Sequence, residues 1–170
     1  DAAATCEAVQ RPSMRFVPVK SAEQQGRLMV HRARQGFIEE RTATLNRIRG
    51  LLSEVGVVLP LKACTVRRQA MALLEDLPGW VNTVIGDLLG EVHRLDERIA
   101  QYDRHISLMA SQDERAKQLM RLCGVGETTA TALIAMIGNG HEFDSGRQLS
   151  AWLGLTPGQY SSGGKTRLGR

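Results

Sequence analysis

The sequence predicts a mainly α-helical protein, with a long antiparallel helical hairpin or coiled coil followed by a small helical domain. Aromatic residues make up only 4% of the 170 residues and hydrophobic residues 42%, a balance that suits helices better than a β-sandwich. Two long stretches place apolar residues at helical spacing. A Gly-Val-Gly sequence then separates two shorter helical segments. We therefore expect three parts, at residues 1–20, 21–115 and 116–170.

The first part, residues 1–20, is expected to hold a short helix and a connector. An Ala-rich stretch follows Asp1, and aspartate is a preferred N-cap residue. Residues 11–20 contain two prolines and alternating apolar residues, which is typical of an extended connector or an edge strand. Asp1 and Glu7 are too far apart in sequence to share a helix face, so the two carboxylates cannot form a metal-binding pair by themselves.

The second part opens with a long helix predicted over residues 21–55. Ser21 and Gln24 have the spacing of a capping box, and Gly56 ends the helical pattern. One face of this helix is an apolar stripe, formed by Ile38, Leu45, Ile48, Leu52 and Val55. A shorter and weaker helical segment, 61–77, follows and is expected to stop at Pro78-Gly79.

The clearest periodicity in the chain comes next and has the heptad spacing of a coiled coil. Its apolar residues alternate steps of three and four: Ile85, Leu88, Val92, Leu95, Ile99, Tyr102, Ile106 and Met109. Such a stripe must be covered. We expect the helix at 21–55 to fold back on it, and a second copy of the chain to pair with it in a homodimer or a higher homo-oligomer. Charged residues around the heptads indicate a structural role and not a catalytic one.

The third part contains Gly124-Val125-Gly126 between two expected helices. The glycines permit a sharp turn, and the free amides at the start of the second helix can hold a phosphate. This pattern resembles the helix-hairpin-helix motif of sequence-independent DNA-binding proteins, with Gly124, Gly126 and Thr128 as the phosphate-binding candidates. The basic residue that often follows the second glycine is missing, and Glu127 and Thr128 stand there instead. A purely structural turn is the alternative.

The last stretch of the chain places hydroxyl groups beside basic residues. A short helix is expected to start at Asp144-Ser145 and run through Trp152, and the helical part of the chain is expected to stop at Pro157. Tyr160-Ser161-Ser162 follow before two glycines. No acid follows Asp144, whereas four basic residues do: Arg147, Lys165, Arg167 and Arg170. A hydroxyl beside fixed positive charge suits attack on a phosphodiester, because the cations hold the phosphate and stabilise the charge of the transition state. The alternative is a flexible Ser/Gly loop with solvated charges.

The overall composition indicates which class of partner the protein binds and in which cellular compartment it is expected. The net charge of +4 and the pI of about 9.3 favour nucleic acid as a partner. Three cysteines without a CxxC pair, Cys6, Cys64 and Cys123, indicate reduced cytosolic thiols and no disulfide framework or zinc site. No apolar run approaches the roughly 18 residues of a membrane span, and no signal-peptide pattern is present. We expect a cytoplasmic protein with no membrane partner, and a fragment of a longer chain.

Taken together, these pieces resemble one family. Its pattern is an Asp-Ala-x-Ala run beginning at Asp1, a long helical middle, Gly-Val-Gly-x-x-Thr-Ala at 124–130, the stretch 149–157, and Ser161-Ser162-Gly163. The sequence looks like the bacterial insertion-sequence transposases that combine a RuvC-like Asp-Glu-Asp-Asp nuclease domain with a serine-bearing transposase domain, the bridge-RNA-guided recombinases. The resemblance covers essentially the whole chain and is most specific in 119–170.

The resemblance implies roles for particular residues. Asp1 matches the last carboxylate of the nuclease quartet and would be a Mg²⁺ ligand, with the other three acids upstream of this chain. Ser162 matches the serine nucleophile, and Ser161 is the close alternative. A guide RNA would choose the DNA sequence, which leaves the protein to hold nucleic-acid backbones through basic residues, namely Lys165, Arg167, Arg170 and Arg147. Since one carboxylate cannot hold two metal ions, we expect this chain alone to bind nucleic acid weakly and not to cut it.

The resemblance also gives an identity to the terminal parts. Residues 1–20 would be the end of the nuclease domain and its connector, and 116–170 an incomplete transposase domain. Two other functions stay open. One is a non-catalytic DNA-binding and dimerisation module made of the coiled coil and the helix-hairpin-helix. The other is a tyrosine-type strand-transfer enzyme using Tyr160, which needs a cluster of Arg and His where only His141 and the last arginines are available.

Overall fold

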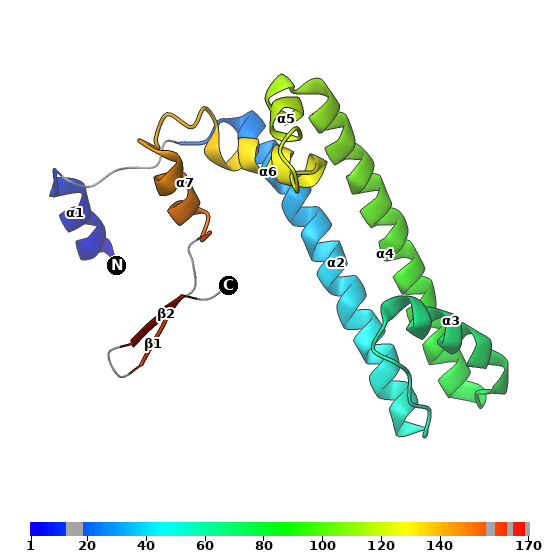
Figure 1. The fold of residues 1–170 in the computed structure, drawn as a ribbon. Helices are drawn as coiled ribbons and strands as arrows, with labels where there is room; N and C mark the ends of the chain where they lie inside the picture. The colour runs from blue at the N-terminus through cyan, green and yellow to red at the C-terminus, as the bar shows by residue number, and fades with distance from the viewer. Residues whose placement is uncertain (13–18, 156–158, 163–164, 169–170) are drawn as a thin grey trace. The chain divides into compact units, whose positions relative to one another are not determined.

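The structure of the protein is a computed structural model that describes residues 1–12, 19–155, 159–162 and 165–168 (Figure 1). The prediction of a mainly α chain is confirmed. The chain divides into two compact units. We call Lys20–Met136 the long-helix unit, and Asp1–Val19 together with Ile137–Arg170 the terminal unit. The domain boundaries expected at residues 20 and 115 stay predictions, as do the coiled-coil and helix-hairpin-helix assignments.

The long-helix unit is built from two long helices and several short ones. Its elements are α2 (Ala22–Glu54), α3 (Ala63–Leu73), the 3-10 helix η1 (Leu74–Asp76), α4 (Gly79–Gln112), α5 (Glu114–Leu119) and most of α6 (Glu127–Ile137). Pro78 and Gly79, expected to stop the segment before them, also open α4, with Pro78 at its N-cap. Proline suits this position because it has no amide hydrogen to leave unpaired.

Helix α2 begins and ends as its sequence predicts. The Ser21 hydroxyl accepts a hydrogen bond from the Gln24 amide at 3.1 Å, and the Gln24 side chain accepts one from the Ser21 amide at 2.9 Å, which completes the capping box. At the other end Gly56 has a φ of 82° and donates to the Ser53 carbonyl, while the Val57 amide donates to Leu52 at 2.9 Å. This pair of bonds is a Schellman motif, which needs the left-handed backbone that glycine adopts without strain.

Helices α2 and α4 run antiparallel along each other, as Figure 1 shows. Three arginines at seven-residue steps of α2 reach aspartates whose numbers fall as the arginine numbers rise, which only antiparallel chains permit. The pairs are Arg27–Asp113 at 2.8 Å, Arg34–Asp103 at 2.5 Å and Arg41–Asp96 at 2.9 Å. The last aspartate also pairs with Arg67 of α3, so one carboxylate joins three helices.

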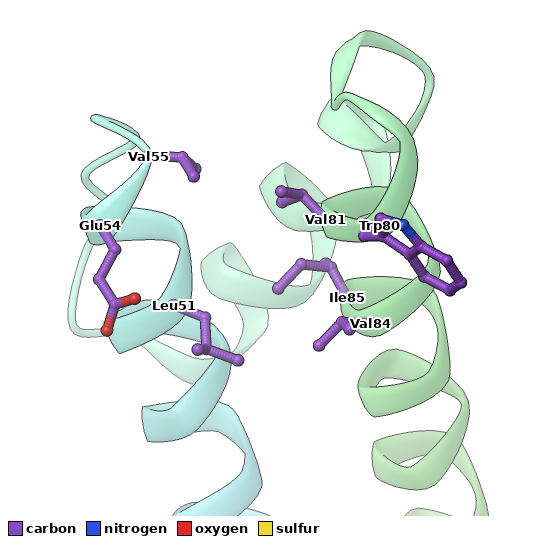
Figure 2. A pocket seen from close by; sticks show the side chains of 7 residues that line it. All are labelled: Leu51, Glu54, Val55, Trp80, Val81, Val84 and Ile85. Carbon is purple, nitrogen blue, oxygen red and sulfur yellow. The ribbon is translucent and has the colours of Figure 1, made fainter.

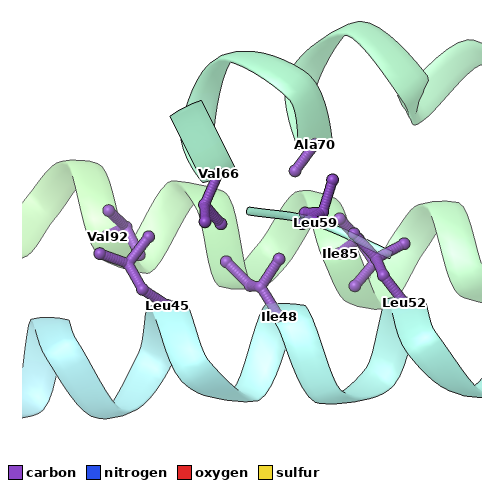
Figure 3. Packing of buried hydrophobic residues seen from close by; sticks show 8 residues of the cluster. All are labelled: Leu45, Ile48, Leu52, Leu59, Val66, Ala70, Ile85 and Val92. Carbon is purple, nitrogen blue, oxygen red and sulfur yellow. The ribbon is translucent and has the colours of Figure 1, made fainter. Parts of the chain in front are cut away.

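The main core lies where α3 packs against both long helices (Figure 3). Its buried residues come from all three helices and the loop after α2: Leu45, Ile48, Leu52, Leu59, Val66, Ala70, Ile85 and Val92. The heptad stripe on α4 is covered along its length, with Ile85, Val92, Leu95, Ile99 and Ile106 buried. Val55, expected in the α2 stripe, is 46% exposed because α2 ends at Glu54 and Val55 is its C-cap.

A smaller core holds α5 and α6 against the end of α4. Its buried residues are Ala110, Ala116, Ala130 and Ile134, with Leu119, Met120 and Val125 packed around them. The helix expected to continue through Cys123 ends at Leu119. The residues after it form successive tight turns, in which the Arg121 amide donates to Gln118 and the Leu122 amide to Leu119. These short-range bonds replace the helical ones, so the chain bends before it reaches the glycines.

The terminal unit consists of short elements: α1 (Ala2–Gln10), α7 (Gly146–Trp152), β1 (Gln159–Ser162) and β2 (Lys165–Leu168). The short helix expected from Asp144-Ser145 through Trp152 is confirmed, since α7 ends at Trp152. Gly154, with a φ of 74°, donates to Ala151, and the Leu155 amide donates to Ser150 at 2.9 Å, which closes α7 in a Schellman motif. Pro157 and most of the connector expected at 11–20 lie outside the described residues.

The cysteines, Cys6, Cys64 and Cys123, are free and exposed. Within the described helices, no stretch has both the length and the apolar character required to cross a lipid bilayer.

Candidate active site

The predicted hydroxyl and basic residues lie on an antiparallel pair of strands. In the register of β1 and β2, Ser162 is the partner of Lys165, Ser161 of Thr166, and Tyr160 of Arg167. Directly opposed residues of such a pair have Cα atoms roughly 4.5–5.5 Å apart. The fold therefore brings the candidate nucleophile, Ser162, next to a lysine that follows it closely in sequence. Gly163, Gly164 and Arg170 lie outside the described residues.

The sequence contains a hairpin signal for these two strands that the composition of the segment does not reveal. Two glycines, at 163–164, separate two short runs that contain Tyr, Ser, Thr and Leu. A Gly-Gly pair between two such runs is typical of a β-hairpin. The prediction of a Gly-rich loop identified the glycines but not the pairing of the strands on either side.

Arg147, a basic residue predicted to bind nucleic acid, lies in the first turn of α7. The Ser145 side chain accepts from the Gln148 amide at 3.3 Å and so caps this helix, as the Asp144-Ser145 start predicted. Phe143 and Trp152 pack edge to face, with ring centroids 5.6 Å apart, and this contact closes the loop onto α7. Arg147 therefore belongs to a short, locally stabilised segment, separate in sequence from the strands.

Asp1 is the N-cap of α1, and its side chain is exposed and makes no capping hydrogen bond. Its carbonyl accepts from the Thr5 amide and the Thr5 hydroxyl, both at 3.0 Å. Glu7, the nearest acid in the sequence, is paired with Arg11 at 2.5 Å. Among residues 1–12, 19–155, 159–162 and 165–168, no three His, Cys, Asp or Glu side chains are grouped to hold a metal ion. These residues alone therefore do not fit a two-metal site.

The predicted phosphate-binding turn lies between α5 and α6. Gly124 has a φ of 85°, and the Val125 amide donates to the Leu122 carbonyl at 3.1 Å. The first α6 amide bonded to a backbone carbonyl is that of Ala130, which donates to Gly126 at 2.9 Å. The three preceding amides, at 127–129, have no acceptor within the described structure. Such a helix start carries partial positive charge and can bind an anion.

The acid that replaces the usual basic residue of this motif is held by α4. The Ser107 hydroxyl donates to Glu127 Oε2 at 2.6 Å. This bond ties the Glu127 carboxylate to the neighbouring helix, while Thr128 on the same turn is exposed. A carboxylate at this position lowers the affinity of the turn for phosphate, since like charges repel. The sequence showed the substitution but not the serine twenty residues earlier that contacts it.

A partly buried polar pair, missed from the sequence, joins α6 to α2. Thr131, 1% exposed, donates its hydroxyl to the Glu127 carbonyl at 2.7 Å, and His31 Nε2 lies 3.1 Å from the Thr131 hydroxyl oxygen. Burial lowers the pKa of His31 below its ordinary value, and the charge of Arg34 adds to this. His31 is therefore a structural partner of α6.

A second missed residue, Asp113, lies at the corner between α4 and α5. Its carboxylate accepts from the Arg115 side chain and amide and from Arg27 at the start of α2. The Arg115 hydrogen bonds, followed by that of Arg27, hold the pKa of Asp113 well below its usual range. The same hydrogen bond raises the pKa of Arg27. An aspartate directly after a long helix is a signal for such a corner, because it can cap the next helix.

Comparisons with known proteins agree with the family suggested by the motifs. Residues 116–170 match the model of the Transposase IS116/IS110/IS902 family. The chain is 42% identical, over 99% of its length, to the "Probable family 20 transposase" of Pseudomonas aeruginosa, and covers 52% of that protein. No solved structure matches the chain.

Two further relatives are transposases for insertion sequence elements. The one for IS1111A of Coxiella burnetii is 36% identical over 99% of this chain, which covers 47% of it. The one for IS1328 of Yersinia enterocolitica is 34% identical over 99% of this chain, which covers 51% of it. The chain thus spans about half the length of the curated relatives it matches. Its sequence is similar to insertion-sequence transposases over nearly its whole length, and residues 116–170 carry the match to the IS116/IS110/IS902 family.

Proposed function

We propose that the chain is part of a DNA transposase that cuts and rejoins strands through a serine nucleophile, Ser162. The observation that carries this proposal is the register of β1 and β2, which places Ser162 opposite Lys165 within the segment that matches the transposase family. The relatives are named transposases and extend the similarity to residues 1–115. The catalytic step itself is our inference from this placement.

The proposed step is a transfer at phosphorus. The Ser162 oxygen forms a bond to a DNA phosphate, the bond between that phosphorus and one deoxyribose oxygen breaks, and the leaving oxygen takes up a proton. The product is a phosphoserine link that a second strand's hydroxyl resolves by the reverse exchange. Lys165 and Arg167 would stabilise the extra negative charge in the transition state. Ser161 is the alternative nucleophile, one residue earlier on β1.

A Mg²⁺ site is proposed only in part for this chain. Asp1 is a single exposed carboxylate, and the described residues do not group the further ligands that a metal ion needs. We assign Asp1 one ligand position in a site whose other ligands come from elsewhere in a longer transposase. When bound, Mg²⁺ supplies charge neutralisation at the phosphate oxygens. We derive no step of the serine chemistry from it.

Nucleic-acid binding is proposed at two places. The turn with Gly124, Gly126 and Thr128 would hold a DNA backbone phosphate at the start of α6, as in a helix-hairpin-helix. Arg147 and the basic residues of the C-terminal segment would hold further phosphates of DNA or of a guide RNA. Guidance by RNA rests on the motif resemblance, and the salt dependence of binding tests the phosphate contacts. Each lost contact lowers the slope of log K against log salt by about 1.

The long helices are proposed to pair copies of the transposase. Helices α2 and α4 already cover each other's stripes, so a second copy would add to their outer faces in a coiled-coil assembly. This homo-oligomer would bring two sets of strand-transfer residues to the two DNA ends. Sedimentation of the purified chain over a range of concentrations tests the oligomer independently of catalysis.

Covalent trapping tests the proposed chemistry. An intact transposase carrying this sequence is incubated with its donor DNA and Mg²⁺, and the protein–DNA adduct is mapped by mass spectrometry. We expect an adduct on Ser162, and a loss of recombination of at least about a thousandfold in Ser162→Ala, as in other nucleophile deletions. Tyr160→Phe is the matched control and should recombine normally. An adduct on Tyr160, or wild-type recombination by Ser162→Ala, would overturn the serine mechanism.

The alternative function is a non-catalytic module that binds DNA through the α5–α6 turn and dimerises through the long helices. The free amides at the start of α6 favour it, because they need no catalytic residue to bind phosphate. Under this alternative, Ser162→Ala would leave recombination unchanged, while mutation of the glycines at the turn would lower DNA affinity.

A further inference from the structure

A pocket lies between the end of α2 and the start of α4, in the long-helix unit (Figure 2). It encloses about 230 Å³, and its lining residues are Leu51, Glu54, Val55, Trp80, Val81, Val84 and Ile85. Figure 2 shows Leu51 of α2 and Val55 at its C-cap facing the valines and Ile85 on α4. Because Ile85 is fully buried and also belongs to the main core, the pocket lies directly on the packed interior.

The rim of this pocket carries apolar surface that the chain leaves in water. Trp80 is 85% exposed, Val55 46% and Val84 44%. A tryptophan so exposed is unusual, since its large ring gains more from burial than most side chains. Contiguous exposed apolar residues around a hollow are typical of a surface that binds a partner.

The only charged residue that lines the pocket is Glu54, on the edge opposite Trp80 in Figure 2. Glu54 has no ion pair or hydrogen bond with the residues that the structure describes. No cation lines the pocket, so nucleic acid is disfavoured there. Pairing of two copies through this same face would add only a second Glu54 and no cation to pair with the first. The charge of the rim instead fits a partner that brings a lysine or an arginine.

The shape of the site indicates the secondary structure of that partner. The hollow lies between two long helices, and a groove of this kind accepts the side chains of a third helix. The core shows the same arrangement made within the chain, since α3 fits Val66 and Ala70 against Ile48 and Ile85. The pocket is a second groove of the α2–α4 pair, and no other described element of the long-helix unit lines it.

We propose that this groove binds an amphipathic helix of another protein, whose apolar stripe fills the pocket and covers Trp80 while a basic residue at its edge pairs with Glu54. This interaction is separate from the proposed strand transfer and from pairing of two copies of the chain. It would recruit a helical protein to the end of the α2–α4 pair.

The test uses Trp80 as its own reporter. The full chain carries Trp152→Phe, so that Trp80 is the single tryptophan. The probe is a synthetic helical peptide with leucines at i, i+3, i+4 and i+7 and lysines on both flanks, and its counterpart has glutamates in place of the lysines. We expect a saturable blue shift of Trp80 emission with the lysine peptide, and binding weaker by about threefold or more with the glutamate peptide.

Two pairs of variants locate the binding. Glu54→Gln should abolish the preference for the lysine peptide, whereas Glu40→Gln, an exposed acid more than ten residues earlier on α2, should keep it. Val84→Asp should weaken binding by at least about tenfold, whereas Leu108→Asp, 54% exposed farther along α4, should not. Circular dichroism tests whether Val84→Asp folds. If this variant does not fold, the comparison of Glu54→Gln with Glu40→Gln still tests the proposal.

Three results would overturn the proposal. One is the absence of a saturable shift with the lysine peptide. Another is an equal affinity of both peptides for the unmodified rim, which would remove the role of Glu54. The third is a blue shift that rises with chain concentration alone and accompanies dimerisation in sedimentation, which would make a second copy the occupant.

Discussion

The two units of this molecule divide structure from proposed chemistry. Every buried side chain of the described residues lies in the long-helix unit, between Leu28 and Ala135. The proposed catalytic residues, Asp1, Ser161 and Ser162, all belong to the terminal unit. This division predicts that a mutation can lower the stability of the fold without affecting the proposed chemistry, or the reverse. Stability depends on packing between long helices, whereas the proposed strand transfer would depend on short segments of the terminal unit.

The contrast extends to polar contacts. In the long-helix unit, carboxylates are shared between elements distant in sequence, as Asp96 is with Arg41 and Arg67. In the terminal unit, Glu7 bonds to Arg11 and Gln148 to the Asp144 amide, and both bonds join near neighbours. Long-range bonds resist unfolding of the whole unit, while local ones stabilise a single turn.

The largest effect on stability is expected at the centre of the main core. Ile48 is fully buried between α3 and α4. We expect Ile48→Ala to lower the free energy of unfolding by about 3–4 kcal/mol, because it leaves a cavity where helices meet. Chemical denaturation of the 170-residue chain measures the change. The control, Leu61→Ala, removes a side chain that is 82% exposed and should change stability by less than about 0.5 kcal/mol.

The unfolding free energy of Ser162→Ala, measured beside that of Ile48→Ala, compares the two units directly. The serine variant should unfold at the wild-type denaturant concentration, since Ser162 belongs to the terminal unit and both described cores belong to the long-helix unit. If Ser162→Ala lowered the stability of the long-helix unit, the separation of structure from chemistry would be wrong.

The second effect concerns the carboxylate that joins three helices. Asp96 is half-buried and accepts from Arg41 and, through both of its oxygens, from Arg67. We expect Asp96→Asn to lower the free energy of unfolding by about 1–2 kcal/mol, because two guanidinium groups lose their counter-charge. Thermal unfolding at low and high salt measures it. Asp87→Asn makes the same change at an exposed site of α4 and should have little effect.

Periodicity predicted the long-helix unit well, for a physical reason. The heptad stripe of α4 and the capping box of α2 are local patterns, so the sequence shows them directly. The ends of elements were harder. The first helix of the third part, expected through Cys123, stops at Leu119, where short-range hydrogen bonds replace the helical ones. The short helix expected through Trp152 does end there, and Gly154 is the sequence signal for that end.

The candidate site could be predicted as residues but not as an arrangement. Ser162 and Lys165 were singled out by type and charge, and their pairing across two strands required the β register. Glu127 was recognised as a departure from the motif, but its bond to Ser107 joins residues on different helices. No local pattern encodes such a contact. The same holds for His31 and Thr131, which are 100 residues apart.

A third prediction concerns acid. The low pKa of Asp113 means that its ionised form stabilises the fold. This contribution is present above the pKa of an unfolded aspartate, about 3.9, and is lost as the pH falls toward the lower folded value. We expect Asp113→Asn to cost about 1 kcal/mol at neutral pH and to flatten the fall in stability below about pH 5. Denaturation at a series of pH values measures both.

The control for the acid prediction is the next residue. Glu114 has a side chain that is 78% exposed, paired only with Lys117 within one turn of α5. Glu114→Gln should leave the slope of stability against pH near that of the wild type. An equally steep acid transition in Asp113→Asn would show that other carboxylates dominate it.

The smallest effect is expected where the terminal unit has its best-formed contact. Trp152 is 48% exposed and packs edge to face on Phe143. Trp152→Ala should loosen the loop before α7, yet change the unfolding free energy of the long-helix unit by less than about 0.5 kcal/mol, because the contact lies outside both cores. Hydrogen exchange resolves the two responses, with faster exchange expected at 143–155 and unchanged protection in α2 and α4. A changed exchange rate in α4 would mean that the two units unfold together. Their stabilities would then not be independent.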